Sequence, residues 1–190
     1  MAVTTMMKKK GGRLLLAACC ALGVHAAHAF DWKPDGVSVR AGAGGNGTWM
    51  SGVGIVWDWD FQRMRRKAEL TAHTELILNH WRGDAADGDG KDGVTQVVVL
   101  PSLRMRLARG ASPWFIDLGI GASWMDERFH TPRKEFGSRW NFYNMMGLGY
   151  SFGEEHEHEL GLRWVHVSNA GLKKPNPGQD FVQLRYVHRF

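Results

Sequence analysis

The chain has 190 residues, and its formal net charge is +5 at pH 7. Four of the positive charges lie within the first 29 residues, which contain no acidic residue, so residues 30–190 carry only about +1 by the same counting. A nucleic-acid-binding function based on general positive charge therefore loses its support. Disulfide and thiol chemistry are excluded from residues 30–190, because both cysteines, Cys19 and Cys20, precede them.

The first 29 residues are typical of a secretory signal peptide. A positive region of three lysines and Arg13 precedes a short apolar core at residues 14–24, and Ala27-His28-Ala29 forms an A-x-A cleavage site. The apolar core is too short to span a membrane. We therefore expect residues 1–29 to be removed and residues 30–190 to form one domain.

The same segment allows a second interpretation. Leu16-Ala17-Ala18-Cys19 resembles a bacterial lipobox, the motif that precedes a lipid-modified cysteine. The apolar stretch before Cys19 is very short, whereas the A-x-A site is well placed. Cleavage without lipid attachment is therefore favoured.

Apolar and polar residues alternate strictly in several segments after residue 30. Trp114, Ile116 and Leu118, for example, alternate with Asp117 and Gly119. Alternating runs of about 10 residues are the pattern of transmembrane β-strands, whereas no segment has the roughly 18 consecutive apolar residues of a membrane helix. The pattern predicts eight strands, at residues 36–45, 49–60, 66–80, 94–108, 113–127, 139–152, 157–168 and 180–190.

The connections between these strands alternate in length. Those after strands two, four and six are short, and those after strands three, five and seven are longer (81–93, 128–138 and 169–179). Bacterial outer-membrane barrels have short periplasmic turns and long external loops. The connection at Asn46-Gly47 is an exception, because it is tight and should be external. The pattern predicts an all-β fold: an eight-stranded antiparallel transmembrane β-barrel in the outer membrane of a Gram-negative bacterium, with strand seven running outward.

A soluble β-sandwich or lipocalin-like barrel also has alternating strands and is the structural alternative. Seven of the nine tryptophans lie within or at the ends of the predicted strands, as in the aromatic girdles at membrane interfaces. Phe190, at the end of the last strand, resembles the C-terminal aromatic residue of bacterial outer-membrane proteins. Both observations favour the membrane barrel.

Charged residues recur at strand positions of the opposite parity, which face the inside of the predicted barrel. We expect them to form a buried charge network that fills the lumen, and a wide water channel would contradict this expectation. The residues concerned are Arg104, Arg106, Glu159, Arg163 and Arg185.

A histidine and a serine lie two residues apart at the end of the seventh predicted strand. Because residues i and i+2 of a strand point to one face, His166 and Ser168 share the apolar face of Leu162 and Trp164. Asp180, at the start of strand eight, has the parity of that strand's apolar residues, so hairpin pairing would bring it beside His166. Serine, base and carboxylate are what ester hydrolysis by a nucleophilic serine requires. The alternative is a polar boundary where the strand leaves the membrane, and the spacing alone leaves both interpretations open.

The segment from residue 166 to residue 180 resembles the active-site segment of the lipid A 3-O-deacylases, the PagL family. The resemblance rests on His166-Val-Ser168-Asn-Ala-Gly171, followed by Pro175-Asn176, Gly178 and an acidic residue at position 180. Outside this segment it rests on architecture alone: the signal peptide, the eight strands and the terminal aromatic residue. One departure is Asp180, where the family pattern often has glutamate. The shorter carboxylate requires a closer approach of the two strands to reach the imidazole.

The resemblance implies a serine esterase that removes the ester-linked 3-hydroxyacyl chain at position 3 of lipid A. It implies Ser168 as the nucleophile, His166 as the general base and Asp180 as the orienting carboxylate. It also implies an oxyanion hole made of Asn176 and the backbone amide of Gly171, with no cofactor and no metal.

The same resemblance implies lipid A, or whole lipopolysaccharide, and the outer membrane as partners. Lys173 and Lys174 follow the site and are positioned to attract the lipid phosphates, although loop solubility explains them equally well. No nucleic acid is expected as a partner. The oligomeric state stays open, with a homodimer as one alternative.

Two other functions fit the same barrel. An outer-membrane phospholipase would use the same histidine and serine on a different lipid. A non-catalytic structural or adhesin barrel would use its external loops and would not need Ser168.

Overall fold

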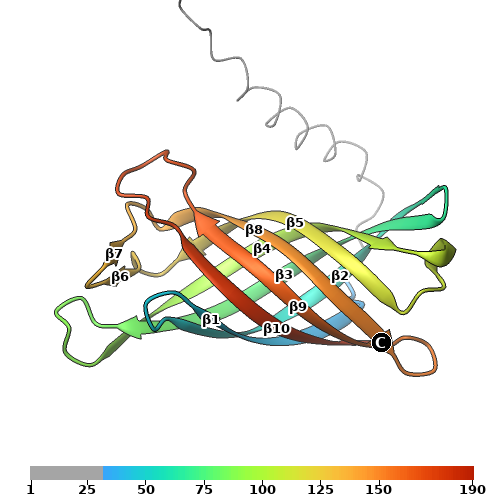
Figure 1. Ribbon diagram of the computed structural model, residues 1–190, viewed down its shortest axis with the longest axis horizontal. Coiled ribbons are helices and arrows are strands. Elements are labelled where there is room, and N and C mark those ends of the chain that lie inside the picture. The colour runs from blue at the N-terminus through green and yellow to red at the C-terminus, as the bar shows by residue number, and fades with distance from the viewer. Residues whose placement is uncertain (1–31) are drawn as a thin grey trace, which may run out of the picture. The chain divides into compact units, whose positions relative to one another are not determined.

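Eight long antiparallel strands form a closed barrel in the computed structural model, which describes residues 32–190 (Figure 1). Around the barrel the strands follow the order β1-β10-β9-β8-β5-β4-β3-β2, and β1 closes on β10. The predicted all-β barrel is confirmed, whereas the predicted signal peptide and Cys19 lie outside the described residues. The barrel strands are β1 (Gly36–Gly44), β2 (Trp49–Arg65), β3 (Ala68–Asp84), β4 (Lys91–Arg106), β5 (Trp114–Met125), β8 (Trp140–Phe152), β9 (His158–Ser168) and β10 (Gln179–Arg189).

Two short elements lie in the connections. The strands β6 (His130–Thr131) and β7 (Lys134–Glu135) pair as a small hairpin between β5 and β8. A single turn of 3-10 helix, η1 (Ala108–Gly110), joins β4 to β5. In the part of the chain that the structure describes, no helix is long and apolar enough to cross a membrane.

The predicted bounds of two connections, after the second and the third strand, are wrong. The predicted turn at residues 61–65 belongs to β2, which continues past an irregularity between Asp58 and Gln62 and pairs with β3 as far as Arg65. Residues 81–84 and 91–93 were expected in a loop, but they extend β3 and β4, whose pairing ends at Asp84 and Lys91. In both places the backbone pairing continues beyond the segment with alternating hydrophobicity, so each strand is longer than that segment. Figure 1 shows the β2–β3 hairpin at the end of the barrel opposite the β6–β7 hairpin.

The side chains of each strand alternate between the outer surface and the lumen. In β5, Trp114, Ile116 and Leu118 are exposed, whereas Phe115 and Asp117 between them are buried. This period of two is the expected consequence of the strand pleat. The barrel therefore presents an apolar outer surface and a lumen of mixed polarity.

Ion pairs between buried arginines and carboxylates fill the middle of the lumen, as predicted. Arg104 contacts Asp117 at 2.8 Å and also pairs with Glu159, while Arg163 contacts Asp117 at 3.1 Å. Glu75, which is fully buried, accepts contacts from three arginines: Arg40, Arg163 and Arg185. Buried charges are tolerated only when paired in this way.

One member of the predicted network lies outside it. Arg106 is half-buried and donates to the backbone oxygens of Ser112 and Pro113 and to the hydroxyl of Ser151. It therefore fastens the short β4–β5 connection to β8. Arg106 stands near the end of β4, one inward position beyond Arg104, which explains why it meets the turn instead of the ion pairs.

An aromatic cluster closes the lumen at the end opposite the short turns. Trp81 on β3 contacts the rings of Phe129, Phe136 and Phe181 edge-on, with centroid distances of 5.3, 6.3 and 4.7 Å. All four side chains are buried. Phe129 and Phe136 flank the β6–β7 hairpin, so their burial draws the long β5–β8 loop (residues 126–139) back over the barrel.

Candidate active site

The serine and the histidine singled out from the sequence lie at the end of β9. They follow Leu162 and Trp164 on the outer face of the barrel, both of which are exposed. On the neighbouring strand, Asp180 is the second residue of β10 and pairs directly with His166 in the ladder. The hairpin therefore brings the three side chains to one edge, as strand parity predicts.

Their polar atoms form a continuous hydrogen-bonded chain. His166 Nδ1 lies 2.8 Å from Asp180 Oδ1, and His166 Nε2 lies 3.0 Å from Ser168 Oγ. With the proton on Nδ1, the imidazole donates to Asp180 and accepts from the Ser168 hydroxyl at Nε2. The hydroxyl is almost buried, the imidazole is one-third exposed and the carboxylate is more exposed still.

Two neighbours fix the plane of the imidazole ring. Trp164 stacks on His166 with a centroid distance of 5.9 Å and an interplanar angle of 19°. Gly178 also approaches the ring, so closely that a Cβ atom there would lie 2.9 Å from His166 Cε1. Gly178 also has a φ of +66°, a conformation that favours glycine. Glycine is therefore required here for two independent reasons.

The β9–β10 loop (residues 169–178) is organised by the side chain of Asn169, which is buried. Its Oδ1 accepts from the Gly171 amide at 3.0 Å, and its Nδ2 donates to the Lys173 carbonyl at 2.7 Å. Its backbone amide donates to Asn176 Oδ1 at 3.0 Å. Three other positions of the loop are thus bonded to one residue next to the serine.

The β5–β8 loop supports this arrangement from the side. Asn169 Nδ2 also donates to Ser138 Oγ at 2.9 Å, and the Gly137 amide donates to the Pro175 carbonyl at 2.7 Å. Lys134 Nζ donates to the Gly178 carbonyl at 2.8 Å and to Gln179 Oε1 at 3.0 Å. The lysine therefore holds the residue that packs on His166.

Both residues of the predicted oxyanion hole already form a hydrogen bond within the loop. The Gly171 amide points to Asn169 Oδ1, so it must exchange that partner before it can reach a substrate. Asn176 uses its oxygen for the Asn169 amide, which leaves its Nδ2 as the donor that can face a ligand. Lys173 and Lys174 are exposed on the loop.

The sequence assigned no role to three residues around the site, Gly178, Asn169 and Lys134, although the first two belong to the motif that carries the family resemblance. A glycine immediately before a strand is a signal for a positive φ or a close approach, so Gly178 could have been examined. Asn169 carries no comparable signal. Lys134 is more than 30 residues from the histidine, and only the folding of the β5–β8 loop brings it there.

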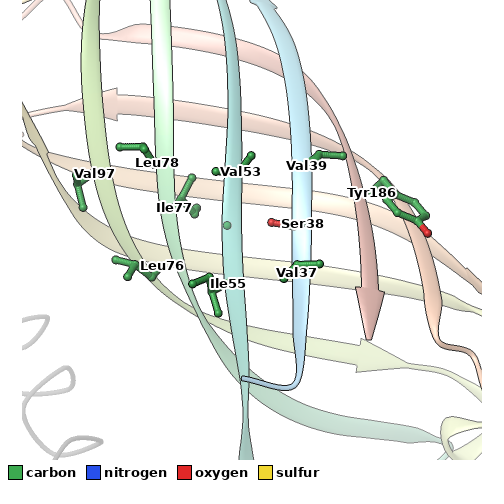
Figure 2. Close-up of a pocket in the computed structure, with 11 residues that line it drawn as sticks. Val37, Ser38, Val39, Val53, Ile55, Leu76, Ile77, Leu78, Val97 and Tyr186 are labelled. Atoms are coloured by element: carbon green, nitrogen blue, oxygen red, sulfur yellow. The ribbon is translucent and has the colours of Figure 1, made fainter. Parts of the chain in front are cut away.

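A hollow of about 550 Å³ lies elsewhere on the outer surface, over β1, β2, β3 and β4, with Tyr186 of β10 at its edge. Figure 2 shows its apolar lining, to which Val39, Val53 and Leu78 contribute from three adjacent strands. It includes none of the three side chains described above. Among residues 32–190, no group of three or more His, Cys, Asp or Glu side chains is arranged to hold a metal ion.

Comparison with known proteins gives consistent results. The family model described as lipid A 3-O-deacylase (PagL) matches residues 25–189. The lipid A deacylase PagL of Bordetella bronchiseptica is 33% identical over 135 residues, which cover 71% of this chain and 70% of that protein. The lipid A deacylase PagL of Pseudomonas aeruginosa is 31% identical over 165 residues, which cover 86% and 89%. A crystal structure of the outer membrane enzyme PagL superposes with a TM-score of 0.69 at 27% identity, covering 82% of this chain and 99% of that one.

Proposed function

We propose that this chain, which belongs to the lipid A 3-O-deacylase (PagL) family, hydrolyses the 3-O ester of lipid A through Ser168, His166 and Asp180. Membership of the family makes it an outer-membrane enzyme with lipid A as its substrate. The observation that carries the proposed mechanism is the hydrogen-bonded chain from Ser168 Oγ through His166 to Asp180 on the outer surface of the barrel.

The position of these residues suits a substrate held in the membrane. They follow exposed apolar residues of β9 and lie at the barrel end with the longer connections, which is the external end in this class of barrel. An acyl chain in the outer leaflet can lie against the apolar surface while its ester reaches Ser168.

The reaction begins with attack of Ser168 Oγ on the ester carbonyl, while His166 Nε2 takes the hydroxyl proton. Asp180 accepts the hydrogen bond from Nδ1 and stabilises the imidazolium that forms. The tetrahedral intermediate then expels the sugar 3-oxygen, which receives the proton from His166. Water attacks the acyl-serine by the same route, releasing the 3-hydroxy fatty acid and restoring Ser168.

The oxyanion of the intermediate requires preorganised donors. We assign this role to Asn176 Nδ2 and to the Gly171 amide. The bond from the Asn169 amide to Asn176 Oδ1 supports the assignment of Asn176, because it orients the amide nitrogen away from Asn169. For Gly171, the oxyanion replaces Asn169 Oδ1 as the acceptor.

Asp180 is proposed as the orienting carboxylate although the family pattern often has glutamate. The supporting observation is its direct pairing with His166 in the β9–β10 ladder, which compensates for the shorter side chain. The resulting contact of 2.8 Å is a normal charge-assisted hydrogen bond. Lys173 and Lys174 are proposed to attract the lipid A phosphates from the exposed loop.

Mass spectrometry of lipids from cells that express the wild type or Ser168→Ala tests this proposal. The wild type is expected to produce lipid A that lacks one 3-hydroxyacyl chain, and Ser168→Ala is expected to lose that species. Heat-dependent gel mobility checks that the variant still folds into a barrel. Loss of acyl chains from phospholipids instead would identify a phospholipase, and identical lipid profiles would identify a non-catalytic barrel.

A further inference from the structure

A second cavity lies at the loop end of the barrel, apart from the serine. It has a volume of about 380 Å³, which is within the usual range of ligand pockets. Three connections line it: the β1–β2 turn with Asn46 and Gly47, the β3–β4 connection with Asp84 and Gly88, and the β6–β7 hairpin with Arg133. We call it the mouth pocket. Figure 1 shows the β6–β7 hairpin and the β3–β4 connection at the same end of the barrel.

Buried side chains anchor the wall of the mouth pocket that the β6–β7 hairpin forms. Phe129 and Phe136, on either side of the β6–β7 hairpin, are buried against Trp81 in the aromatic cluster. Thr131, at the start of the hairpin turn, is also buried and accepts from the Lys134 amide at 3.1 Å. The side of the pocket that carries Arg133 is therefore anchored to the barrel.

A negatively charged, a positively charged and a neutral polar side chain line the mouth pocket: Asp84, Arg133 and Asn46. Asp84 Oδ1 is taken by Lys91, whereas Asp84 Oδ2 lies 3.7 Å from the position that a Cβ on Gly47 would occupy. Arg133 makes a long contact of 3.5 Å with Asn46 Oδ1, so most of its five donors are left for a ligand. A pocket with a carboxylate acceptor beside guanidinium and amide donors matches hydroxyl groups, which donate and accept.

The mouth pocket is joined to the candidate active site through the start of β10. Arg133 directly precedes Lys134, whose Nζ holds the Gly178 carbonyl beside His166. On the opposite wall, Asn46 follows Gly45, whose carbonyl accepts from Gln179 Nε2 at 3.3 Å. Both walls therefore contact the residues that lead into Asp180. One substrate molecule that reaches both places would be long and polar at its outer end.

We propose that the mouth pocket binds the saccharide that extends outward from lipid A in whole lipopolysaccharide. The inference rests on the proposed function, because the acylated end of the same molecule must lie at Ser168. Asp84 accepts a hydrogen bond from a hydroxyl of a sugar ring, and Arg133 and Asn46 donate to its oxygens. Gly47 and Gly88 keep the pocket open, because neither brings a side chain into it.

Deacylation of two substrates by the detergent-solubilised barrel tests this proposal. One substrate is lipopolysaccharide with its core saccharide, and the other is lipid A prepared from it by mild acid hydrolysis. Arg133→Ala is expected to lower the ratio of kcat/KM for lipopolysaccharide over lipid A about tenfold, the effect of losing a charge-assisted hydrogen bond. Arg128→Ala is the matched control, because it removes an arginine of the same loop that pairs with Glu135. A ratio that stays the same in Arg133→Ala overturns the proposal.

Calorimetric titration with the released core oligosaccharide gives a readout that does not depend on catalysis. The wild type is expected to bind the oligosaccharide, with binding lost in Arg133→Ala and retained in Arg128→Ala. Absence of binding to the wild type overturns the mouth-pocket proposal even if lipid A is deacylated. A wild type that binds the oligosaccharide but deacylates neither substrate contradicts the proposed function and leaves the pocket assignment supported.

Discussion

Gly178 offers a sharp test of how the histidine is held. In Gly178→Ala the new Cβ would lie 2.9 Å from His166 Cε1 and 3.4 Å from His166 Nε2. Carbon atoms in contact prefer about 3.5–4.0 Å, so the imidazole or the backbone must move by roughly 0.6–1.1 Å. The hydrogen bonds of the imidazole to Ser168 and Asp180 cannot both survive such a shift at their present lengths.

The expected consequence is a selective loss of turnover. A displacement of about 1 Å at a reacting group costs on the order of 100-fold, which corresponds to about 2.7 kcal/mol in the activation barrier. The φ of +66° adds a conformational cost of about 1–2 kcal/mol to the folded state. We therefore expect kcat on lipid A to fall about 100-fold, with little change in KM, while the barrel still folds.

Gly90→Ala is the matched control, because Gly90 has a φ of +83° and no atom lies within 4 Å of the position that a Cβ there would occupy. It should lose a similar amount of stability and keep wild-type activity. Released 3-hydroxy fatty acid gives the rate in mixed micelles, and urea titration followed by gel mobility gives the stability. If Gly178→Ala stays within about threefold of Gly90→Ala in kcat, the reasoning about the ring position is refuted.

Three further changes probe the site and the lumen. Asp180→Asn should lower kcat about 10³- to 10⁴-fold without unfolding the barrel, as for other serine hydrolases without their orienting carboxylate. Asp180→Glu should keep most of the activity, and equal rates for the wild type and both variants would remove Asp180 from the mechanism. Glu75→Gln should lower the free energy of unfolding by about 3–5 kcal/mol, because it leaves three buried arginines with too few partners. Arg128→Ala, which breaks an exposed ion pair, should lower it by less than about 1 kcal/mol, and urea titration measures both values. Lys134→Met should lower kcat about tenfold at unchanged KM, since it releases the Gly178 carbonyl, and an increase in KM alone would contradict this positioning role.

The strands and the faces of their side chains could be predicted because strand periodicity is local. A residue two positions along a strand returns to the same face whatever the rest of the chain does. This places His166, Ser168 and Asp180 on the outer surface once the strands are assigned. The errors at residues 61–65, 81–84 and 91–93 have the same origin, because backbone pairing continues into segments that lack the apolar pattern.

The supports of the site could not be predicted in this way. Gly178 and Asn169 belong to the motif that carries the family resemblance, but the motif does not show what they contact, and Lys134 lies outside it. Their contacts depend on how the β5–β8 and β9–β10 loops fold against each other, which the burial of Phe129 and Phe136 decides. Neither loop has a periodic pattern from which that packing could be read.

The amino-acid sequence by itself determined the barrel, four of the charges in the lumen (Arg104, Glu159, Arg163 and Arg185) and the three side chains proposed for catalysis, since each follows from alternation or from a short local motif. Glu75 and Arg40, which also belong to the ion pairs, were not predicted. The tertiary structure decided which charges meet. Glu75 on β3 contacts Arg163 on β9 and Arg185 on β10, strands far from it in the chain, only because the sheet closes on itself. Strand parity determines whether a side chain faces inward, whereas its partner across the lumen depends on closure and register, which are properties of the whole barrel.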